Sequence, residues 1–130
     1  MKSEEHKLFK VNQAAVIKNV NGQVLILKRS GKWMLPGGRL EGDTSSSKGL
    51  AREIKEETGI TNCKVEQIVD ARLSKGKNTY MVTFLCSTDK KIVKLSDEHI
   101  DYAWVSKGEL NKYKFEYDEI KKIINLYYGK

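Results

Sequence analysis

Residues 37–60 have the sequence GGRLEGDTSSSKGLAREIKEETGI and contain the local signals from which much of the fold can be predicted. Residues 45–58 are predicted to form a helix, because serine hydroxyls at its start can cap free backbone N–H groups. Leu50 and Ile54 fall on one apolar stripe, and Gly59 suits a left-handed C-cap. One face of this helix should therefore pack against a core.

A neighbouring face of the predicted helix is acidic. Glu53, Glu56 and Glu57 have i, i+3 and i+4 spacing, so their side chains share a face. Like charges at this spacing repel by about 0.2–0.5 kcal/mol per pair in an isolated helix. A divalent cation would neutralise the cluster, and carboxylate oxygens favour Mg²⁺ or Mn²⁺. The spacing predicts a metal site, and the alternative is an ordinary solvated helix face.

Upstream of this helix, residues 35–38, LPGG, are predicted to form a tight turn. Pro36 presets φ, and the two glycines allow positive φ and a close approach of the backbone to a ligand. A backbone carbonyl of this turn could face the metal. The turn and the acidic helix face are therefore expected to lie together.

These spaced residues resemble the signature of a known family. Gly38 is followed at the matching offset by residues 52–60, REIKEETGI, which look like the Nudix box of the Nudix hydrolases. These enzymes are pyrophosphohydrolases that cut substrates in which a nucleoside diphosphate is linked to another group. Residues 33–36, WMLP, and 102–106, YAWVS, are also similar to family segments. The resemblance covers most of the chain, although residues 37–60 alone are diagnostic.

The resemblance implies a fold, a metal and individual roles. It implies an α/β/α sandwich with a mixed β-sheet between helices, and Mg²⁺ or Mn²⁺ as the cofactor. The chain length predicts that residues 1–130 form a single domain. The implied metal ligands are the Gly37 carbonyl, Glu53, Glu56, Glu57 and Glu98. Arg52 would orient the helix carboxylates through a salt bridge. Glu98, in the loop before the Trp-containing strand, would be an additional ligand or the general base, and Glu53 is the competing base.

One position departs from the family pattern. The family has a Glu where this chain has Thr44, and Asp43 stands one position earlier. A one-residue slip of the loop would bring Asp43 into the supporting role of that Glu. The loss of the family Glu is expected to affect the orientation of the Arg52 side chain more than the metal ligands.

The cysteines and histidines are predicted to lie outside the chemistry. Cys63 and Cys86 have no ligand-like spacing with each other or with the histidines and stand in apolar, strand-like contexts. Buried free thiols are therefore expected rather than a disulfide or a zinc site. His6 and His99 are interpreted as surface residues, because a lone His in a polar loop or near a terminus is usually exposed.

Composition indicates a compact enzyme. The 130 residues include 24 Lys+Arg and 17 Asp+Glu, a formal net charge of +7, and the positive excess lies away from the acidic helix. Such a field attracts polyanions, including a phosphate-rich substrate or RNA. A basic surface that serves solubility is the preferred interpretation, and RNA binding is the alternative. The expected partner is a small-molecule nucleotide substrate. No apolar run is long enough for a membrane span and the N-terminus is charged, so a cytoplasmic location is expected. The oligomeric state is left open between a monomer and a homodimer.

The remaining pattern is mixed α/β. Asn21-Gly22 predicts a two-residue hairpin between strands at residues 11–20 and 23–28. Further strands are predicted at residues 64–73, 79–87, 92–95 and 100–105. An amphipathic helix at residues 117–128 should close the chain. The expected fold is a mixed sheet with helix 45–58 on one side and the C-terminal helix on the other.

The expected substrate is a nucleoside triphosphate, normal or oxidised, as for MutT-like members of the family that remove mutagenic nucleotides. Pro36 is the only proline, so the downstream proline of many ADP-ribose pyrophosphatases is absent. RNA 5′-pyrophosphohydrolase and dinucleoside polyphosphate hydrolase are the alternatives. A non-catalytic nucleotide sensor is an alternative of another class, against which the intact REIKEE argues.

Overall fold

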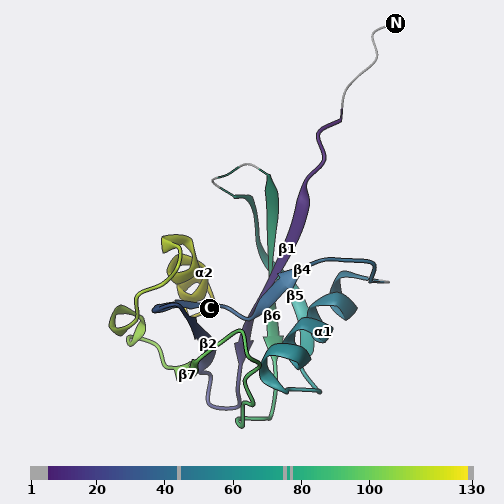
Figure 1. Cartoon of the computed structure of the whole chain (residues 1–130). Coiled ribbons are helices and arrows are strands. Elements are labelled where there is room, and N and C mark those ends of the chain that lie inside the picture. The colour runs from purple at the N-terminus through teal and green to yellow at the C-terminus, as the bar shows by residue number, and fades with distance from the viewer. Residues whose placement is uncertain (1–5, 44, 75, 77, 129–130) are drawn as a thin grey trace, which may run out of the picture.

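The computed structural model describes residues 6–43, 45–74, 76 and 78–128. These residues form a seven-stranded mixed sheet and two long helices (Figure 1). The strands are β1 (Lys10–Lys18), β2 (Val24–Arg29), β3 (Lys32–Met34), β4 (Gly37–Arg39), β5 (Lys64–Leu73), β6 (Thr79–Ser87) and β7 (Asp101–Val105). The helices are α1 (Ser46–Thr58) and α2 (Asp118–Tyr128), with a short 3₁₀ turn at Leu110–Lys112. Neither long helix of the described chain has the length and apolar character needed to cross a membrane, and the cytoplasmic location stays a prediction.

Strand β1 organises the sheet. The main path is β3-β2-β1-β6-β5, in which β1 runs parallel to β6 and the other neighbours are antiparallel. The early part of β1 also pairs with β4, so that Ala14 lies opposite Gly37. The end of β1 pairs with β2, which in turn pairs with β7. Because β4 and β2 use different parts of β1, residues just after Pro36 lie beside the centre of the sheet.

Two cores cover the two faces of the sheet. Strand side chains alternate between faces, so Ala15 and Ile17 of β1 point to one face while Val16 points to the other. Leu50 and Ile54 of α1 join the first core, and the isoleucines of α2 join the second. Figure 1 shows the two helices on opposite sides of the strands. The predicted sandwich with a helix on each side is therefore confirmed.

Most predicted elements are present, with two corrections after residue 34. Residues 92–95 do not form a strand, because Lys94 N–H donates to the carbonyl of Thr58 at 2.8 Å, at the end of α1, and Ile92 is 87% exposed. The predicted tight turn at residues 35–38 is also wrong. Gly37 instead begins β4, since β1 supplies a backbone partner for it.

The first hairpin exists, but its predicted two-residue turn is wrong. Strand β1 ends at Lys18 and β2 begins at Val24, so the connection has five residues. The side-chain oxygen of Asn19 accepts hydrogen bonds from the N–H groups of Asn21 and Gln23, both at 3.0 Å. This local bonding satisfies the loop backbone and makes the wider turn stable.

The cysteines are free thiols, as predicted. Cys86 of β6 is buried in the core beneath α1, and Cys63, which precedes β5, packs against the same core but is only half-buried. The prediction of full burial therefore holds for Cys86 alone.

Gly37 is predicted to be essential to the fold. Its φ is +154°, and a Cβ there would overlap the carbonyl oxygen of Gln13 and lie 2.8 Å from Ala14 Cα. Gly37→Ala should therefore lower the free energy of unfolding by about 2 kcal/mol or more, measured by urea denaturation. Gly42→Ala is the matched control, because nothing lies within 4 Å of the added Cβ. Equal losses in both variants would contradict the argument from close approach.

Candidate active site

Both ends of α1 are capped by local hydrogen bonds. Ser45 Oγ accepts from Lys48 N–H at 3.2 Å at the start of the helix, and Gly59, with φ of +75°, donates to the Lys55 carbonyl at its end. Leu50 and Ile54 hold the apolar face on the sheet. Burial of that face directs the side chains of Glu53 and Glu57 towards β4.

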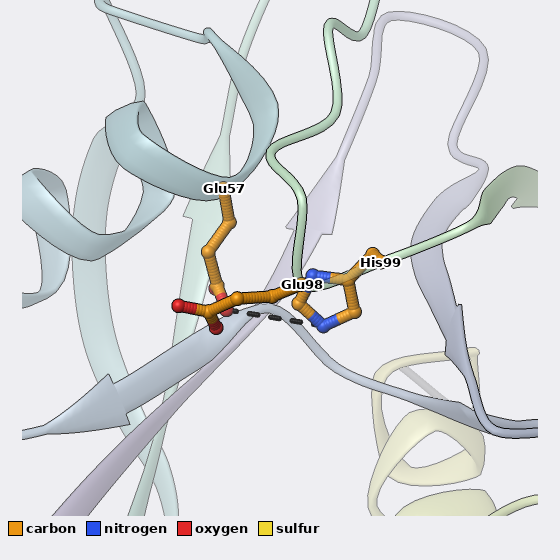
Figure 2. A group of neighbouring side chains, drawn as sticks. All are labelled: Glu57, Glu98 and His99. Atoms are coloured by element: carbon orange, nitrogen blue, oxygen red, sulfur yellow. Dashed lines mark ion pairs between the residues drawn. The ribbon is translucent and has the colours of Figure 1, made fainter.

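Glu57 lies where these elements meet. It is only 6% exposed, and its Oε1 accepts a hydrogen bond from Gly37 N–H at 2.7 Å. Its Oε2 lies 3.9 Å from Nε2 of His99 (Figure 2). Burial raises the pKa of Glu57 to about 8, with the charges of Glu53 and Glu98 adding to the increase against the Gly37 hydrogen bond. An ionised carboxylate at this position is therefore short of a compensating positive charge.

The loop after β6 brings two further groups to Glu57. Its backbone bonds to the end of α1, through Ser96 N–H to the Glu57 carbonyl at 3.3 Å, and the indole N–H of Trp104 donates to the Lys91 carbonyl at 2.9 Å. One ligand atom from each of Glu57, Glu98 and His99 then lies within 4.8 Å of the others (Figure 2). Glu98 is exposed and faces the Glu57 carboxylate.

The prediction that His99 is a surface residue is wrong. It is 5% exposed, and burial holds its pKa below the ordinary value. The loop bonds described above carry it under the surface, and these long-range contacts have no local sequence signal. The one available hint was its position next to Glu98, the loop carboxylate already expected at the site.

Glu53 lies one turn earlier, against β4. An added Cβ on Gly38 would lie 2.6 Å from the Glu53 carboxylate, so this glycine leaves the space that the carboxylate fills. Burial is the largest influence on Glu53 and raises its pKa, while Arg52 opposes the increase. Glu53 and Glu57 thus contact neighbouring residues of the same short strand.

Arg52 connects the site to the loop before α1. Its guanidinium makes two hydrogen bonds to Asp43, from Nε to Oδ1 at 2.9 Å and from Nη2 to Oδ2 at 3.1 Å. Its Nη1 reaches Glu53 at 3.1 Å and Glu56 at 3.3 Å. Asp43 thus contacts Arg52, as expected if a one-residue slip of the loop places Asp43 in the supporting role of the family Glu. Thr44 lies outside the described residues. The Arg52 guanidinium holds the pKa of Asp43 below its ordinary value.

The expected site residues do not all converge equally. Glu57, Glu98 and the backbone of Gly37 come together, and Glu53 lies beside them against Gly38. Glu56 shares the helix face, but its side chain is 58% exposed and pairs with Arg52. Gly37 presents its N–H to Glu57, whereas the expected ligand was its carbonyl.

A divalent cation fits this donor set. Oxygens of two carboxylates and an imidazole nitrogen lie within 4.8 Å of one another, and burial raises the pKa of Glu57 to about 8, which disfavours its charged form. Within the described part of the chain, no lysine or arginine forms an ion pair with Glu57 or Glu98. A bound cation would supply the missing positive charge.

The chain is similar to several known proteins. The family model described as NUDIX domain matches residues 8–127. A MutT-like protein of Streptomyces ambofaciens is 30% identical over 107 residues, which are 81% of this chain and 69% of that protein. Nucleoside triphosphatase NudI of Escherichia coli O139:H28 is 31% identical over 96 residues, covering 64% of this chain and 67% of NudI. The crystal structure of a MutT protein from Methanosarcina mazei Go1 has a TM-score of 0.77 and 29% identity, covering 97% of each chain.

The burial of Glu57 predicts a pH dependence of stability in the metal-free protein. Its pKa rises from the ordinary 4.5 to about 8 on folding, so between these values the folded chain binds more protons than the unfolded chain. The stabilising effect is complete below about pH 4.5 and is lost as pH rises through about 8. The Tm of the wild type should therefore fall relative to that of Glu57→Gln across this range in EDTA. A constant difference would contradict the raised pKa.

The Asp43 contact predicts an indirect effect on metal affinity. Asp43→Asn removes the carboxylate that balances Arg52, and the guanidinium should then compete more strongly for Glu53 and Glu56. The Kd for Mn²⁺, measured by calorimetry, should rise about tenfold. This is the lower end of the usual loss of metal affinity when a residue that orients a metal ligand is replaced. Asp97→Asn, an exposed loop residue with the same charge change, is the control. Equal effects of both variants would mean that only overall charge matters.

Proposed function

The chain belongs to the NUDIX domain family, whose enzymes hydrolyse pyrophosphate bonds, and from that premise we propose that it cleaves a nucleoside triphosphate, normal or oxidised. The products would be a nucleoside monophosphate and pyrophosphate, and Mg²⁺ or Mn²⁺ would be required. The observation that carries the proposal is the buried Glu57 carboxylate with a carboxylate oxygen of Glu98 within 4.8 Å of it. The choice of substrate is supported by the similarity to NudI, a nucleoside triphosphatase.

Hydrolysis of a phosphoanhydride depends mainly on positioning and on charge neutralisation. A divalent cation, when bound, neutralises charge on the phosphates and lowers the pKa of water. Glu57 and Glu98 would hold it, together with Glu53 and Glu56 from the same face of α1. Gly37 N–H fixes the Glu57 carboxylate in direction, and Arg52 fixes Glu53.

The proton of the attacking water needs an acceptor. One oxygen of Glu53 is already occupied by a hydrogen bond from Arg52 at 3.1 Å, although burial raises the pKa of this carboxyl above its ordinary value. Glu98 is exposed, and no hydrogen bond of its carboxylate is formed within the described residues. Glu98 is therefore the preferred general base, acting through the oxygen that does not hold the cation, and Glu53 serves as a ligand.

RNA bearing a 5′-triphosphate is the second candidate substrate. Lys90, Lys91 and Lys94 are exposed on the same loop that leads to Glu98, so they could contact a longer polyanion.

Dinucleoside polyphosphates would use the same cleavage chemistry. A non-catalytic sensor would need to bind nucleotide without hydrolysis, and the assembled carboxylates argue against it.

Product analysis tests the proposed function. The protein is incubated with a panel of normal and oxidised nucleoside triphosphates, a dinucleoside polyphosphate and triphosphorylated RNA, and the products are separated by ion exchange. Release of pyrophosphate from at least one nucleoside triphosphate, lost in EDTA and restored by Mg²⁺ or Mn²⁺, is expected. Binding of nucleotides without any hydrolysis would favour the sensor and reject the proposal.

Removing single carboxylates should separate the ligands from their neighbours. Glu57→Gln and Glu56→Gln are each expected to lower kcat by roughly a hundredfold or more, because charge stabilisation of the transition state is lost. Lys55→Gln on the same helix is the control and should change kcat less than about threefold, since its side chain is exposed. Comparable losses in all three variants would indicate a general weakness of α1.

The loop lysines distinguish free nucleotides from RNA. Their triple replacement by Gln, at Lys90, Lys91 and Lys94, should leave kcat/KM for nucleoside triphosphates within about threefold, because no aromatic-interleaved basic motif accompanies them. A control triple replaces exposed lysines elsewhere, at Lys107, Lys114 and Lys122. If RNA were far the better substrate, and only the loop triple abolished that reaction and its salt dependence, RNA would become the first choice.

A further inference from the structure

His99 has an environment that a structural histidine does not explain. Its side chain is 2% exposed, yet Nδ1 has no hydrogen-bond partner among the residues that the structure describes. Nε2 lies 3.9 Å from Glu57 Oε2, which is longer than a hydrogen bond. Buried polar groups are normally hydrogen-bonded, because an unpaired one loses its interaction with water. Within the described residues Nε2 has no hydrogen bond either, so the lone pair of this nitrogen is available to a cation at the site.

The spacing of the three groups suits a shared cation. Figure 2 shows the Nε2 edge of the ring directed towards the carboxylates of Glu57 and Glu98. The ligand atoms lie within 4.8 Å of one another. Donors at about 2.1 Å from one ion are separated by roughly 3–4 Å, so a small closure would bring all three to one centre.

We propose that Nε2 of His99 is a nitrogen ligand of the cation held by Glu57 and Glu98, and that the centre therefore prefers a first-row transition ion to Mg²⁺. The inference rests on the proposed function in requiring that a divalent cation binds at these carboxylates. Imidazole nitrogen binds transition ions well, whereas Mg²⁺ strongly prefers oxygen donors. The preference follows from one residue outside the Nudix box.

The neighbouring carboxylates have other partners, which limits the alternatives. Arg52 engages Glu53 and Glu56, while Glu57 and Glu98 form no ion pair with a lysine or arginine of the described chain. A cation is accordingly drawn to the Glu57 and Glu98 pair, beside His99. If His99 served packing alone, its replacement would affect Mg²⁺ and Mn²⁺ binding equally.

Pulsed EPR of the full chain loaded with Mn²⁺, without nucleotide, tests the ligand directly. The wild type should show echo modulation from a directly coordinated nitrogen, which changes when all histidine is labelled with ¹⁵N. This measurement needs no substitution, so it does not depend on the folding of a variant. The chain has two histidines, and His6→Gln should keep the signal while His99→Gln removes it. His6 is exposed and serves as the matched control.

Affinities give the second readout. His99→Gln should raise the Kd for Mn²⁺ about tenfold or more but the Kd for Mg²⁺ less than about twofold. Two results would overturn the role of His99 and leave the proposed function intact, provided that the wild type is active and binds Mn²⁺. One is a wild-type spectrum without nitrogen modulation, and the other is an equal loss of Mn²⁺ and Mg²⁺ affinity in His99→Gln. Failure of the wild type to bind any divalent cation would overturn both.

Discussion

The buried carboxylate of Glu57 is the constraint on which the site depends. Its hydrogen bond to Gly37 N–H at 2.7 Å ties the last turn of α1 to β4, and its own carbonyl accepts the Ser96 N–H of the loop before β7. Three segments distant in sequence are therefore aligned by one residue. The carboxylate has little exposure to water, so its ionisation is unfavourable until a cation is near. Metal binding and the local fold should accordingly be coupled.

Elements with strong local signals could be predicted from the sequence. Helix α1 begins one residue later than expected, and β5 and β6 have the expected bounds, because caps and apolar patterns specify them locally. The absence of a strand at residues 92–95 could not be predicted, because the backbone of this segment bonds to the end of α1 rather than to a neighbouring strand. The Pro-Gly-Gly sequence predicts a turn at Gly37, but this residue pairs with Ala14 of β1 and therefore begins β4.

The site was predictable to a similar extent. Helical spacing placed the glutamates on one face, yet it could not separate the buried Glu57 from the exposed Glu56. That difference arises from the packing of β4 and the loop against the final turn of α1. His99 was misassigned for the same reason, because burial of a residue in a polar loop depends on contacts far along the chain. Asp43 was correctly considered as a partner of Arg52, since a short loop permits a one-residue slip.

Proton release on metal binding tests the central role of Glu57 most directly. Calorimetric titration of the metal-free protein with Mn²⁺ at pH 7, in two buffers of different ionisation enthalpy, counts the protons released per ion. Because the pKa of Glu57 is about 8 without an ion, binding should release about one proton in the wild type and much less in Glu57→Gln. Metal binding with no proton release, or with the same release in both proteins, would contradict the account.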